Sequence, residues 1–406
     1  MGDYIDTRTP PEPELRAEAD PEALIAQLQA LVNSRGTLKA TEAQKHEIKR
    51  LSVAAVGVVE EPFETMVRVI YSPLQLVTVR IAQEHGIFTR LLAADGPVSF
   101  STLADETDME PYVLESLLDY LGTQHMLLQV TQGSFAPTTL TYSLAEPLFN
   151  DTVTHYHETF IPGFGALSAQ IKSKSKKTAF EIGHNFEGSF YEWAETRPEV
   201  KGAFHRFMEA QFASMPSWLS VVDFRADFGS GLDADGGVAF VDVGGGIGQQ
   251  CALLRKEVPG LPGRVVLQDR ESIVAKALEV EGMESMAYDY FTEQPVKNAC
   301  VYYFRQILHN NTDDDCVRIV RSHLTAMGPH SRIVIDEKCL PDEKPPPDAP
   351  GVDYTASLSL GMKVIFNAQE RREAHWRRLL GGAGLVVEDV RRFTANHDAV
   401  IIARRA

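Results

Sequence analysis

With 406 residues, the chain is longer than one ordinary compact core, so two or three domains are expected. Hydrophobic residues make up 44% and charged residues 23%, a globular composition, and no apolar run approaches the roughly 18 residues that would span a bilayer. The net charge of -17 opposes binding to nucleic-acid phosphates. The sequence therefore predicts a globular protein with neither a membrane nor a nucleic acid as partner.

Residues 1–45 are polar and acidic and are expected to form a flexible arm. Within them PEALIAQLQALVNSRG has leucines at helical spacing and predicts one helix. The start of the chain has no apolar stretch typical of a secretory signal. The four cysteines lie far apart, with neither a C-x-x-C pair nor zinc spacing, and predict reduced, buried thiols in a cytoplasmic protein.

Residues 46–150 are expected to form a mainly helical domain. Helices broken at Gly86 and Gly96 lead into the short helix STLADET, the amphipathic helix PYVLESLLDYLGTQ and two short strands around Gly133. This order is typical of a winged helix, which often reads DNA. The expected recognition helix has two acidic residues and no Lys or Arg, so it favours dimerisation or packing over a substrate instead.

Residues 151–235 are predicted to be a helical linker that contributes to a substrate pocket. Their aromatic and Met residues at helical spacing are more often core than ligand contacts. In residues 236–406, strand patterns such as VAFVDV, RVVLQD and ACVYYFRQI alternate with the helix patterns GQQCALLRKEV, ESIVAKALEV and DDDCVRIVRSHLTAM. This alternation predicts an α/β, Rossmann-like domain with a mostly parallel sheet covered on both faces.

A glycine loop follows the strand VAFVDV. Gly244, Gly245 and Gly246 stand where residues without a Cβ let the backbone turn tightly and a ligand approach closely. The dinucleotide pattern G-x-G-x-x-G is not met, because Gln249 occupies the place of its last glycine. The loop therefore predicts a binding site that does not depend on a phosphate.

Asp269 ends the next strand, VVLQD, where a carboxylate can accept hydrogen bonds from two ribose hydroxyls. Asp289, in AYDYF, can accept from an adenine amino group while the neighbouring Tyr290 covers the ring. Together with the glycine loop, these residues make S-adenosylmethionine the cofactor that fits best. The alternative is that Asp289 and Tyr290 form an ordinary polar loop.

His309, in VYYFRQILHNN, follows a strand at the edge where α/β sheets build their sites. It could be a satisfied core residue, a metal ligand or a base. No second His or carboxylate cluster lies at ligand spacing around it, so no metal is expected. An imidazole with a pKa near 6.5 can accept a phenolic or enolic proton, and the oxyanion can then attack a sulfonium methyl group.

The motifs VDVGGGIGQQ, VVLQD, DYFTEQPVKNACVYYFRQILHNN, IVIDEKCLPD and NAQERREAHWRRLLGGAGL resemble those of fungal and plant class I O-methyltransferases of the caffeate and flavonoid type. The resemblance extends over residues 65–406. It implies that residues 236–406 form the cofactor-binding methyltransferase domain and that the winged helix is a dimerisation domain. Homodimers through the N-terminal helices are also implied, and the apolar segment MVRVIYSPLQLVTVRIA suits such an interface.

The resemblance also implies site residues. His309 matches the general base, and Glu337 and Glu370 match its flanking acids, since a carboxylate on the far ring nitrogen fixes the tautomer and raises basicity. Alternatively, Glu370 stabilises a helix start and Glu337 is a surface strand end. Arg305 matches a cationic contact to the cofactor, or forms a surface ion pair. The candidate cofactor-binding residues are Asp242, Gly244, Gly245, Gly246, Asp269, Asp289, Tyr290 and Arg305.

Two residues depart from the family pattern: Asn311 replaces an aromatic residue, and Lys338 replaces an apolar one. Adjacent strand residues point to opposite faces, so if Glu337 faces the pocket, Lys338 should not. Candidate substrate contacts are His157, Lys338, Met362 and Phe366.

The intact set of one histidine and two acids favours methyl transfer to a hydroxyl group of a small aromatic or polyketide-type metabolite. A second hypothesis follows from fungal proteins that resemble these enzymes but act as pericyclases with bound S-adenosylmethionine, catalysing Alder-ene or Diels-Alder type cyclisations. His157, His309, Arg305 and Lys338 would then donate hydrogen bonds. A third, a silent winged-helix regulator that senses the cofactor, is disfavoured by the acidic recognition helix.

Overall fold

The computed structural model describes residues 20–34, 37–213, 216–232 and 237–406. The chain divides into two compact units, residues 1–65 and 66–406. The first contains α1 (Pro21–Asn33), α2 (Glu42–Val59) and the start of α3 (Pro62–Ile70), none of which has a buried residue. The predicted boundary at residue 45 falls inside α2, because Thr41 and Gln44 form a capping box that starts this helix at Glu42. Residues 1–19 and 35–36 of the predicted arm lie outside the described residues.

A small helical domain opens the second unit. Its core is formed by Leu114, Leu117, Leu118 and Leu121 of one amphipathic helix together with Phe88. The order of helices and the hairpin agree with the sequence pattern, whereas the assignments as a winged helix and as a dimerisation domain remain predictions. The elements are α4 (Leu74–Glu84), α5 (Ile87–Ala93), β1 (Val98–Ser99), α6 (Phe100–Thr107), α7 (Pro111–Thr123), β2 (Leu127–Thr131), β3 (Ser134–Pro137) and α8 (Thr139–Ala145), with strand order β1-β3-β2.

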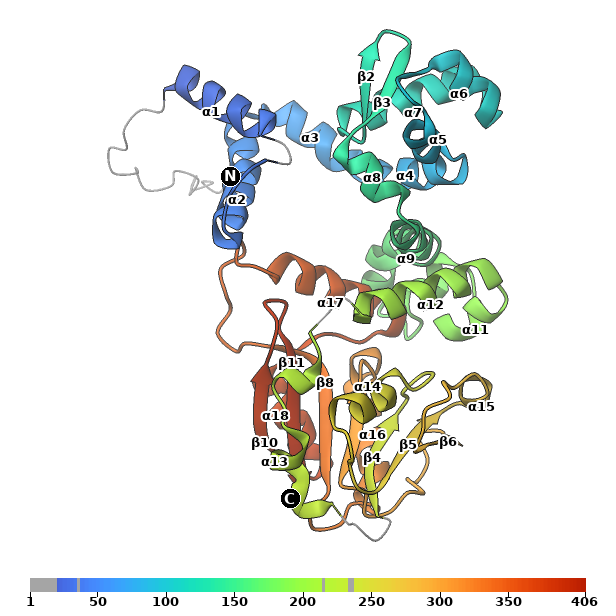
Figure 1. Cartoon of the computed structure of the whole chain (residues 1–406), viewed down its shortest axis with the longest axis vertical. Helices are drawn as coiled ribbons and strands as arrows, with labels where there is room; N and C mark the ends of the chain where they lie inside the picture. Colours follow the sequence, from blue (N-terminus) through green and yellow to red (C-terminus); the bar gives the residue numbers. More distant parts are fainter. Residues whose placement is uncertain (1–19, 35–36, 214–215, 233–236) are drawn as a thin grey trace, which may run out of the picture. The chain divides into compact units, whose positions relative to one another are not determined.

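Helices from two distant parts of the sequence form a second helical layer (Figure 1). Phe160, Phe180 and Trp193 pack there against Val364, and a Cβ at Gly163 would lie 2.5 Å from a methyl carbon of Val364. The predicted boundary at residue 150 falls inside α9, and the one at 235 lies outside the described residues. The helices are α9 (Pro147–Ser173), α10 (Ala179–Gly183), α11 (Phe190–Glu195), α12 (Pro198–Ala213) and α17 (Val352–Phe366).

An eight-stranded sheet forms the α/β domain, in the order β10-β11-β8-β7-β4-β5-β6 with β9 paired to β8. The neighbouring strands in the run β8-β7-β4-β5-β6 are parallel to one another, whereas β11 is antiparallel to both β8 and β10. The sheet is therefore mostly parallel, as predicted. The strands are β4 (Val238–Val243), β5 (Arg264–Asp269), β6 (Met283–Ala287), β7 (Val301–Arg305), β8 (Arg332–Leu340), β9 (Arg371–Arg372), β10 (Leu385–Arg392) and β11 (Asp398–Arg405).

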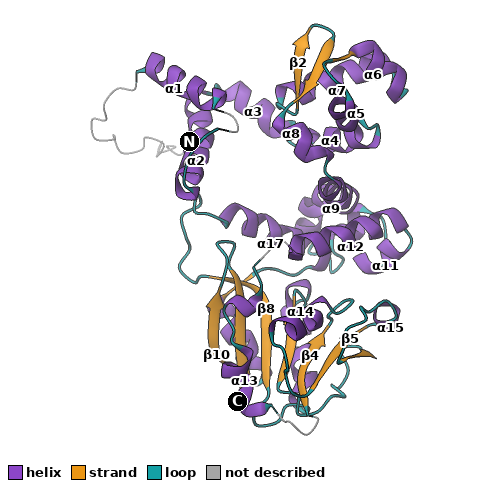
Figure 2. Cartoon of the chain, in the orientation of Figure 1, coloured by secondary structure: helices purple, strands orange, loops and turns teal. Residues whose placement is uncertain are grey.

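Helices cover both faces of this sheet (Figure 2). Tyr302 and Tyr303 illustrate the alternation, since the first packs with Trp376 on one face and the second with Trp218 on the other. The short and long helices of the domain are η1 (Trp218–Ser220), α13 (Phe224–Phe228), η2 (Gly229–Gly231), α14 (Gln249–Glu257), α15 (Glu271–Val274), η3 (Leu308–Asn310), α16 (Asp313–Leu324) and α18 (Glu373–Ala383).

One predicted helix is much shorter than expected. The pattern ESIVAKALEV predicts nearly three turns of helix, whereas α15 ends at Val274. The following chain turns toward the glycine loop, where the Leu278 N–H donates to the carbonyl of Ile247 at 2.9 Å. A tertiary hydrogen bond thus replaces the continuation of the helix.

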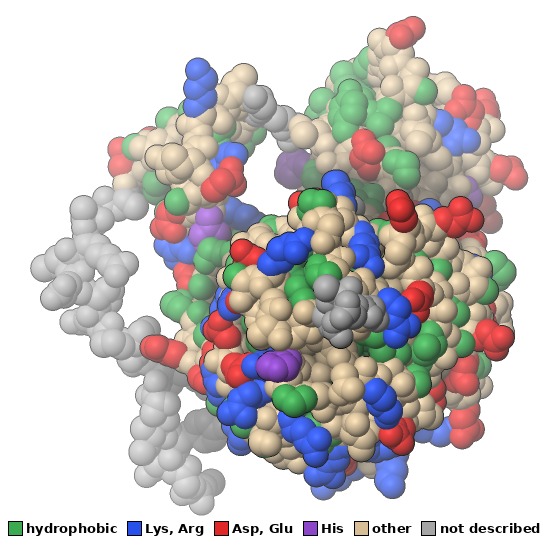
Figure 3. Space-filling view, turned by 60° about the horizontal axis from the view of Figure 1, so that its bottom comes forward, with side chains coloured by type: hydrophobic (Ala, Val, Ile, Leu, Met, Phe, Trp, Pro, Cys, Tyr) green, Lys and Arg blue, Asp and Glu red, His purple; other side chains and the backbone are tan. Residues whose placement is uncertain are grey.

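The charges on the surface and the length of the helices indicate which partners the protein could bind. On the face turned forward in Figure 3, acidic and basic side chains lie among uncharged ones. No helix within the described residues is long and apolar enough to cross a membrane.

Candidate active site

The glycine loop turns sharply between β4 and α14. Gly244 and Gly246 have φ of 71° and 61°, values that favour glycine, and a Cβ at Gly245 would lie 2.3 Å from the carboxyl group of Asp242. The N–H groups of Gly244 and Gly245 donate to the Gln268 carbonyl at 2.7 and 3.2 Å. The loop is therefore held over the ends of β4 and β5, and there is no space for a side chain at Gly245.

Two buried or partly buried carboxylates lie beneath this loop. Asp242 is 1% exposed, and its Oδ1 has no hydrogen-bond partner among the described residues. Burial raises the pKa of Asp242 to about 7. Asp269 accepts from the N–H groups of Gly246 at 2.9 Å and Arg270 at 2.7 Å, while burial raises its pKa. Each Asp269 oxygen keeps a lone pair that a ribose hydroxyl could use.

Asp289 and Tyr290 follow β6. Asp289 is exposed, and its Oδ1 accepts from the Phe291 N–H at 2.9 Å, which closes a local turn. Tyr290 is half-buried and its ring lies 4.9 Å from that of Phe291. The polar-loop alternative thus describes the present contacts of Asp289, and its role toward adenine remains a prediction.

Arg305 ends β7 beside a buried carboxylate. Its Nε lies 3.5 Å from Oδ2 of Asp336, which also accepts from the Tyr303 hydroxyl at 2.6 Å. Asp336 is 4% exposed, so this pair is not the surface ion pair considered as the alternative. Arg305 is held at the carboxyl end of β7, the same edge as the glycine loop of β4, its neighbour in the sheet.

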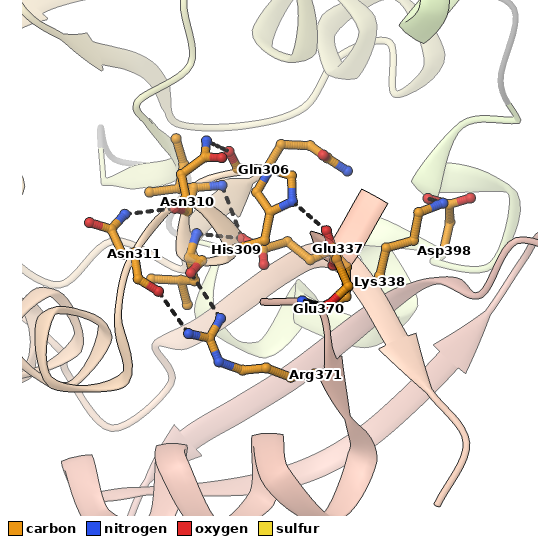
Figure 4. Close-up of polar contacts among 12 residues, drawn as sticks. Gln306, His309, Asn310, Asn311, Glu337, Lys338, Glu370, Arg371 and Asp398 are labelled. Atoms are coloured by element: carbon orange, nitrogen blue, oxygen red, sulfur yellow. Dashed lines mark hydrogen bonds and ion pairs between the residues drawn. The ribbon is translucent and has the colours of Figure 1, made fainter. Parts of the chain in front are cut away.

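His309 lies in η3 directly after β7 and is braced by Glu370 (Figure 4). Its Nδ1 is 2.8 Å from Glu370 Oε1, and both side chains are buried. Burial would lower the pKa of His309, but the charge and hydrogen bond of Glu370 and the charge of Glu337 raise it above its ordinary value. No described residue bonds to Nε2, which leaves that nitrogen available to a ligand.

Glu337, on β8, holds the backbone that carries His309. Its Oε1 accepts from the N–H groups of Ile307 at 3.0 Å and Leu308 at 2.6 Å. Burial raises the pKa of Glu337 to about 7, and Oε2 has no partner among the described residues. Glu337 is therefore a buried strand residue, and Glu370 precedes α18 without entering its first turn, so neither alternative reading fits the contacts.

Sequence reasoning missed Arg371. Its guanidinium is fully buried and donates to the carbonyls of Leu308 at 2.9 Å and Asn311 at 2.8 Å, and its Nε pairs with Asp313 at 2.9 Å. It fixes both ends of the turn that carries His309. The only signal in the sequence is its position next to Glu370.

Asn311, which departs from the family pattern, also belongs to this turn. Its side-chain amide donates to the Ile307 carbonyl at 2.7 Å. The departure therefore replaces an aromatic side chain with a hydrogen bond that stabilises the same turn.

Lys338 points away from His309 toward Asp398 (Figure 4). The Lys338 ammonium pairs with Asp398 at 2.7 Å in a buried ion pair, and lies 5.2 Å from the Tyr354 ring centre. Glu337 and Lys338 thus face opposite sides, as their adjacency in a strand predicts. The contacts of Lys338 give no support to its predicted role as a substrate donor.

The remaining substrate candidates lie in the second helical layer. His157 is partly buried on α9 and contacts Glu158 at 2.9 Å. Met362 is buried on α17, and Phe366 at the end of that helix lies 6.0 Å from the Tyr191 ring. Tyr191, which sequence reasoning missed, also faces the Arg270 guanidinium at 5.3 Å. It is an aromatic residue that connects this layer with the end of β5.

Among the described residues, no group of three or more His, Cys, Asp or Glu side chains could hold a metal ion.

Comparison with known proteins gives consistent matches. The O-methyltransferase domain family matches residues 164–386. The O-methyltransferase ucdC of Aspergillus ustus is 31% identical over 88% of this chain and 94% of its own. The 16-O-methyltransferase bsc6 of Alternaria brassicicola is 30% identical over 94% of each chain.

Solved structures agree with these matches. The complex of LepI with S-adenosylmethionine aligns over 95% of this chain and 100% of its own, with a TM-score of 0.80 and 26% identity. A structure described as a pericyclic reaction enzyme aligns over the same shares, with a TM-score of 0.79 and 25% identity. The chain therefore belongs to the S-adenosylmethionine-dependent O-methyltransferase family.

Proposed function

We propose that the protein transfers a methyl group from S-adenosylmethionine to a hydroxyl group of a small aromatic or polyketide-type metabolite, with His309 as the general base. The observation that carries this proposal is the hydrogen bonding of the two ring nitrogens of His309. Glu370 engages Nδ1, whereas Nε2 has no partner among the described residues. A base needs such a free nitrogen, oriented by a hydrogen bond on the other side of the ring.

The residues around the glycine loop fit an adenosyl cofactor. A side chain at Gly245 would collide with Asp242, and Asp242 Oδ1 is buried without a partner, so the loop is open to a ligand that brings its own donors. We assign Asp269 to the ribose, Asp289 and Tyr290 to the adenine, and Arg305 and Asp242 to the polar end of the cofactor. When bound, the cofactor supplies an electrophilic methyl group on a sulfonium.

The proton transfer can be assigned to particular atoms. An ionised Glu370 is only an acceptor, so Nδ1 carries a proton and Nε2 presents a lone pair to the substrate hydroxyl. When Nε2 accepts that proton, Glu370 and Glu337 stabilise the imidazolium. Glu337 and Arg371 position the ring by fixing the backbone of η3.

The second candidate is a pericyclase that keeps the cofactor. The structural likeness to a pericyclic reaction enzyme favours it. The arrangement of the donors does not, since Lys338 pairs with Asp398, His157 with Glu158 and Arg305 with Asp336. We therefore propose methyl transfer first.

Methyl-labelled S-adenosylmethionine distinguishes the two reactions. The purified chain is incubated with the labelled cofactor and hydroxylated aromatic or polyketide-type acceptors, and products are identified by mass spectrometry. We expect label in the product and one S-adenosylhomocysteine per turnover. An isomerised acceptor with the cofactor unconsumed would establish the pericyclase instead.

Replacement of Gly245 by Ala is expected to weaken cofactor binding by about tenfold or more, because the new Cβ would displace the Asp242 carboxyl group. Calorimetric titration with S-adenosylhomocysteine measures the effect. Gly381→Ala is the matched control, because a Cβ there meets nothing within 4 Å. Unchanged affinity in Gly245→Ala would show that the cofactor does not depend on this loop.

We also propose that the protein is a homodimer formed through its N-terminal helices. These helices expose large apolar side chains, including Val53, Val58, Phe63 and Ile70, which are 56–84% exposed. An unpaired apolar surface of this kind favours association.

We further propose a reducing compartment such as the cytoplasm, because all four cysteines are free and buried.

Changing Phe63 and Ile70 together to Asp is expected to halve the mass measured by light scattering, because charged groups cannot be buried unpaired in an interface. Ile171→Asp, on an exposed apolar residue of α9 outside residues 46–150, is expected to leave the mass of the dimer unchanged. A wild-type chain that is already monomeric would contradict the dimer.

A further inference from the structure

A cavity of about 440 Å³ lies outside the cofactor site, between the chain after β8, the first half of α17 and the start of α18. Its volume lies in the range of about 300 to 1,000 Å³ that holds small organic molecules. None of the candidate cofactor-binding residues lines it. The apolar part of its wall is formed by Leu340, Pro341, Pro345, Val352, Ala356 and Ala374.

Cations exceed free carboxylates in this wall. The wall contains three cations, Lys344, Arg372 and Arg378, and two carboxylates. Of the carboxylates, Glu370 is bound to His309, and Asp342 accepts from the Ala374 N–H at 2.8 Å. Arg372 donates to the Pro341 carbonyl. Within the described residues, Lys344 and Arg378 have neither an ion-pair nor a hydrogen-bond partner, so their charges are available to a ligand.

His397 is a further residue of the cavity wall. Its pKa is lowered first by burial and then by the charges of Arg392, Lys338 and Arg372, which outweigh Asp398. His397 is thus neutral at physiological pH and adds no charge of its own. Two cations in the wall of one cavity that are unpaired in the described part of the chain are unusual for a protein with a net charge of -17.

We propose that this cavity binds a small organic anion, with an apolar body on the aliphatic wall and a carboxylate or phosphate group between Lys344 and Arg378. Arg378 can bind such a group through two parallel N–H donors, and Lys344 adds a point charge. Glu370 lines the cavity and also contacts His309, so a bound anion would lie next to the carboxylate that braces the base.

Calorimetric titration of the full chain tests the site, with saturating S-adenosylhomocysteine present to fill the cofactor loop. The probes are naphthoate, naphthyl phosphate and neutral naphthamide. At least one anion is expected to bind saturably and about tenfold or more tighter than the amide, and the stronger of the two identifies the charged group preferred. Equal binding of all three, or no saturable binding, would overturn the proposal.

Variants locate the binding. The double change of Lys344→Gln and Arg378→Gln is expected to weaken anion binding by about tenfold or more, and both side chains are exposed, so folding should persist. Arg377→Gln removes a neighbouring cation that is paired with Glu373 and does not line the cavity, and should leave affinity unchanged. Full anion affinity in the double variant would place the binding elsewhere and overturn the assignment.

Discussion

His309→Ala is expected to lower kcat for methyl transfer by about 10² to 10⁴-fold, the contribution of a positioned general base. The variant loses Nε2 as proton acceptor, whereas the glycine loop and Asp269 remain in place. Affinity for S-adenosylhomocysteine should therefore be unchanged. Single-turnover rates with saturating cofactor separate the chemical step from binding.

The control for this variant is His330→Ala, which removes an exposed imidazole from the same domain and should retain the wild-type rate. An unchanged rate in His309→Ala would remove this residue from the proposed role. Loss of cofactor affinity in parallel with the rate would show instead that the change disturbs the loop.

Arg371→Ala is expected to destabilise the protein by about 3–5 kcal/mol, the usual cost of breaking a buried charged network. The change strips two buried carbonyls, those of Leu308 and Asn311, of their donors and leaves a space beside Trp376. Urea denaturation followed by tryptophan fluorescence measures the free energy of unfolding.

Arg377→Ala provides the comparison, because it removes an arginine of α18 that is 46% exposed and paired with Glu373. Its expected cost is within about 0.5 kcal/mol. If Arg371→Ala were equally mild, the hydrogen bonds of Glu337 and Asn311 would be sufficient to fix the turn of His309. Arg371→Lys should recover only part of the stability, since an ammonium cannot reach both carbonyls in the same plane.

Much of the fold follows from local patterns. VAFVDV and RVVLQD contain the short apolar runs VAFV and VVL, each followed by an acid near the end of the segment, and they form the parallel strands β4 and β5. By contrast, α17 divides its surface between Phe160 of α9 on one side and Glu370 on another, so its apolar residues show no single stripe. Such a helix is recognised only once its neighbours are known.

The candidate site likewise has features that the sequence predicts and features that only the structure shows. The motifs predict that His309, Glu337 and Glu370 belong to one site, and in the structure Glu370 contacts the imidazole while Glu337 holds the turn that carries it; their catalytic roles remain predictions. The sequence could not show that Glu337 accepts from two backbone N–H groups rather than contacting the imidazole, because that depends on how the chain turns after Arg305. Arg371 acts on carbonyls some 60 residues earlier in the chain, a pairing that no local pattern contains.

The pH dependence of kcat, measured for the wild type and for Glu370→Gln, tests most directly whether a neutral His309 takes the proton. The charge of Glu370 raises the pKa of His309 above 6.5, and only the neutral ring can act as a base. Wild-type activity should therefore rise with pH through that pKa, and Glu370→Gln should move the rise to lower pH. Activity that falls as pH rises through this range, or a rise that Glu370→Gln leaves in place, would contradict a base braced by Glu370.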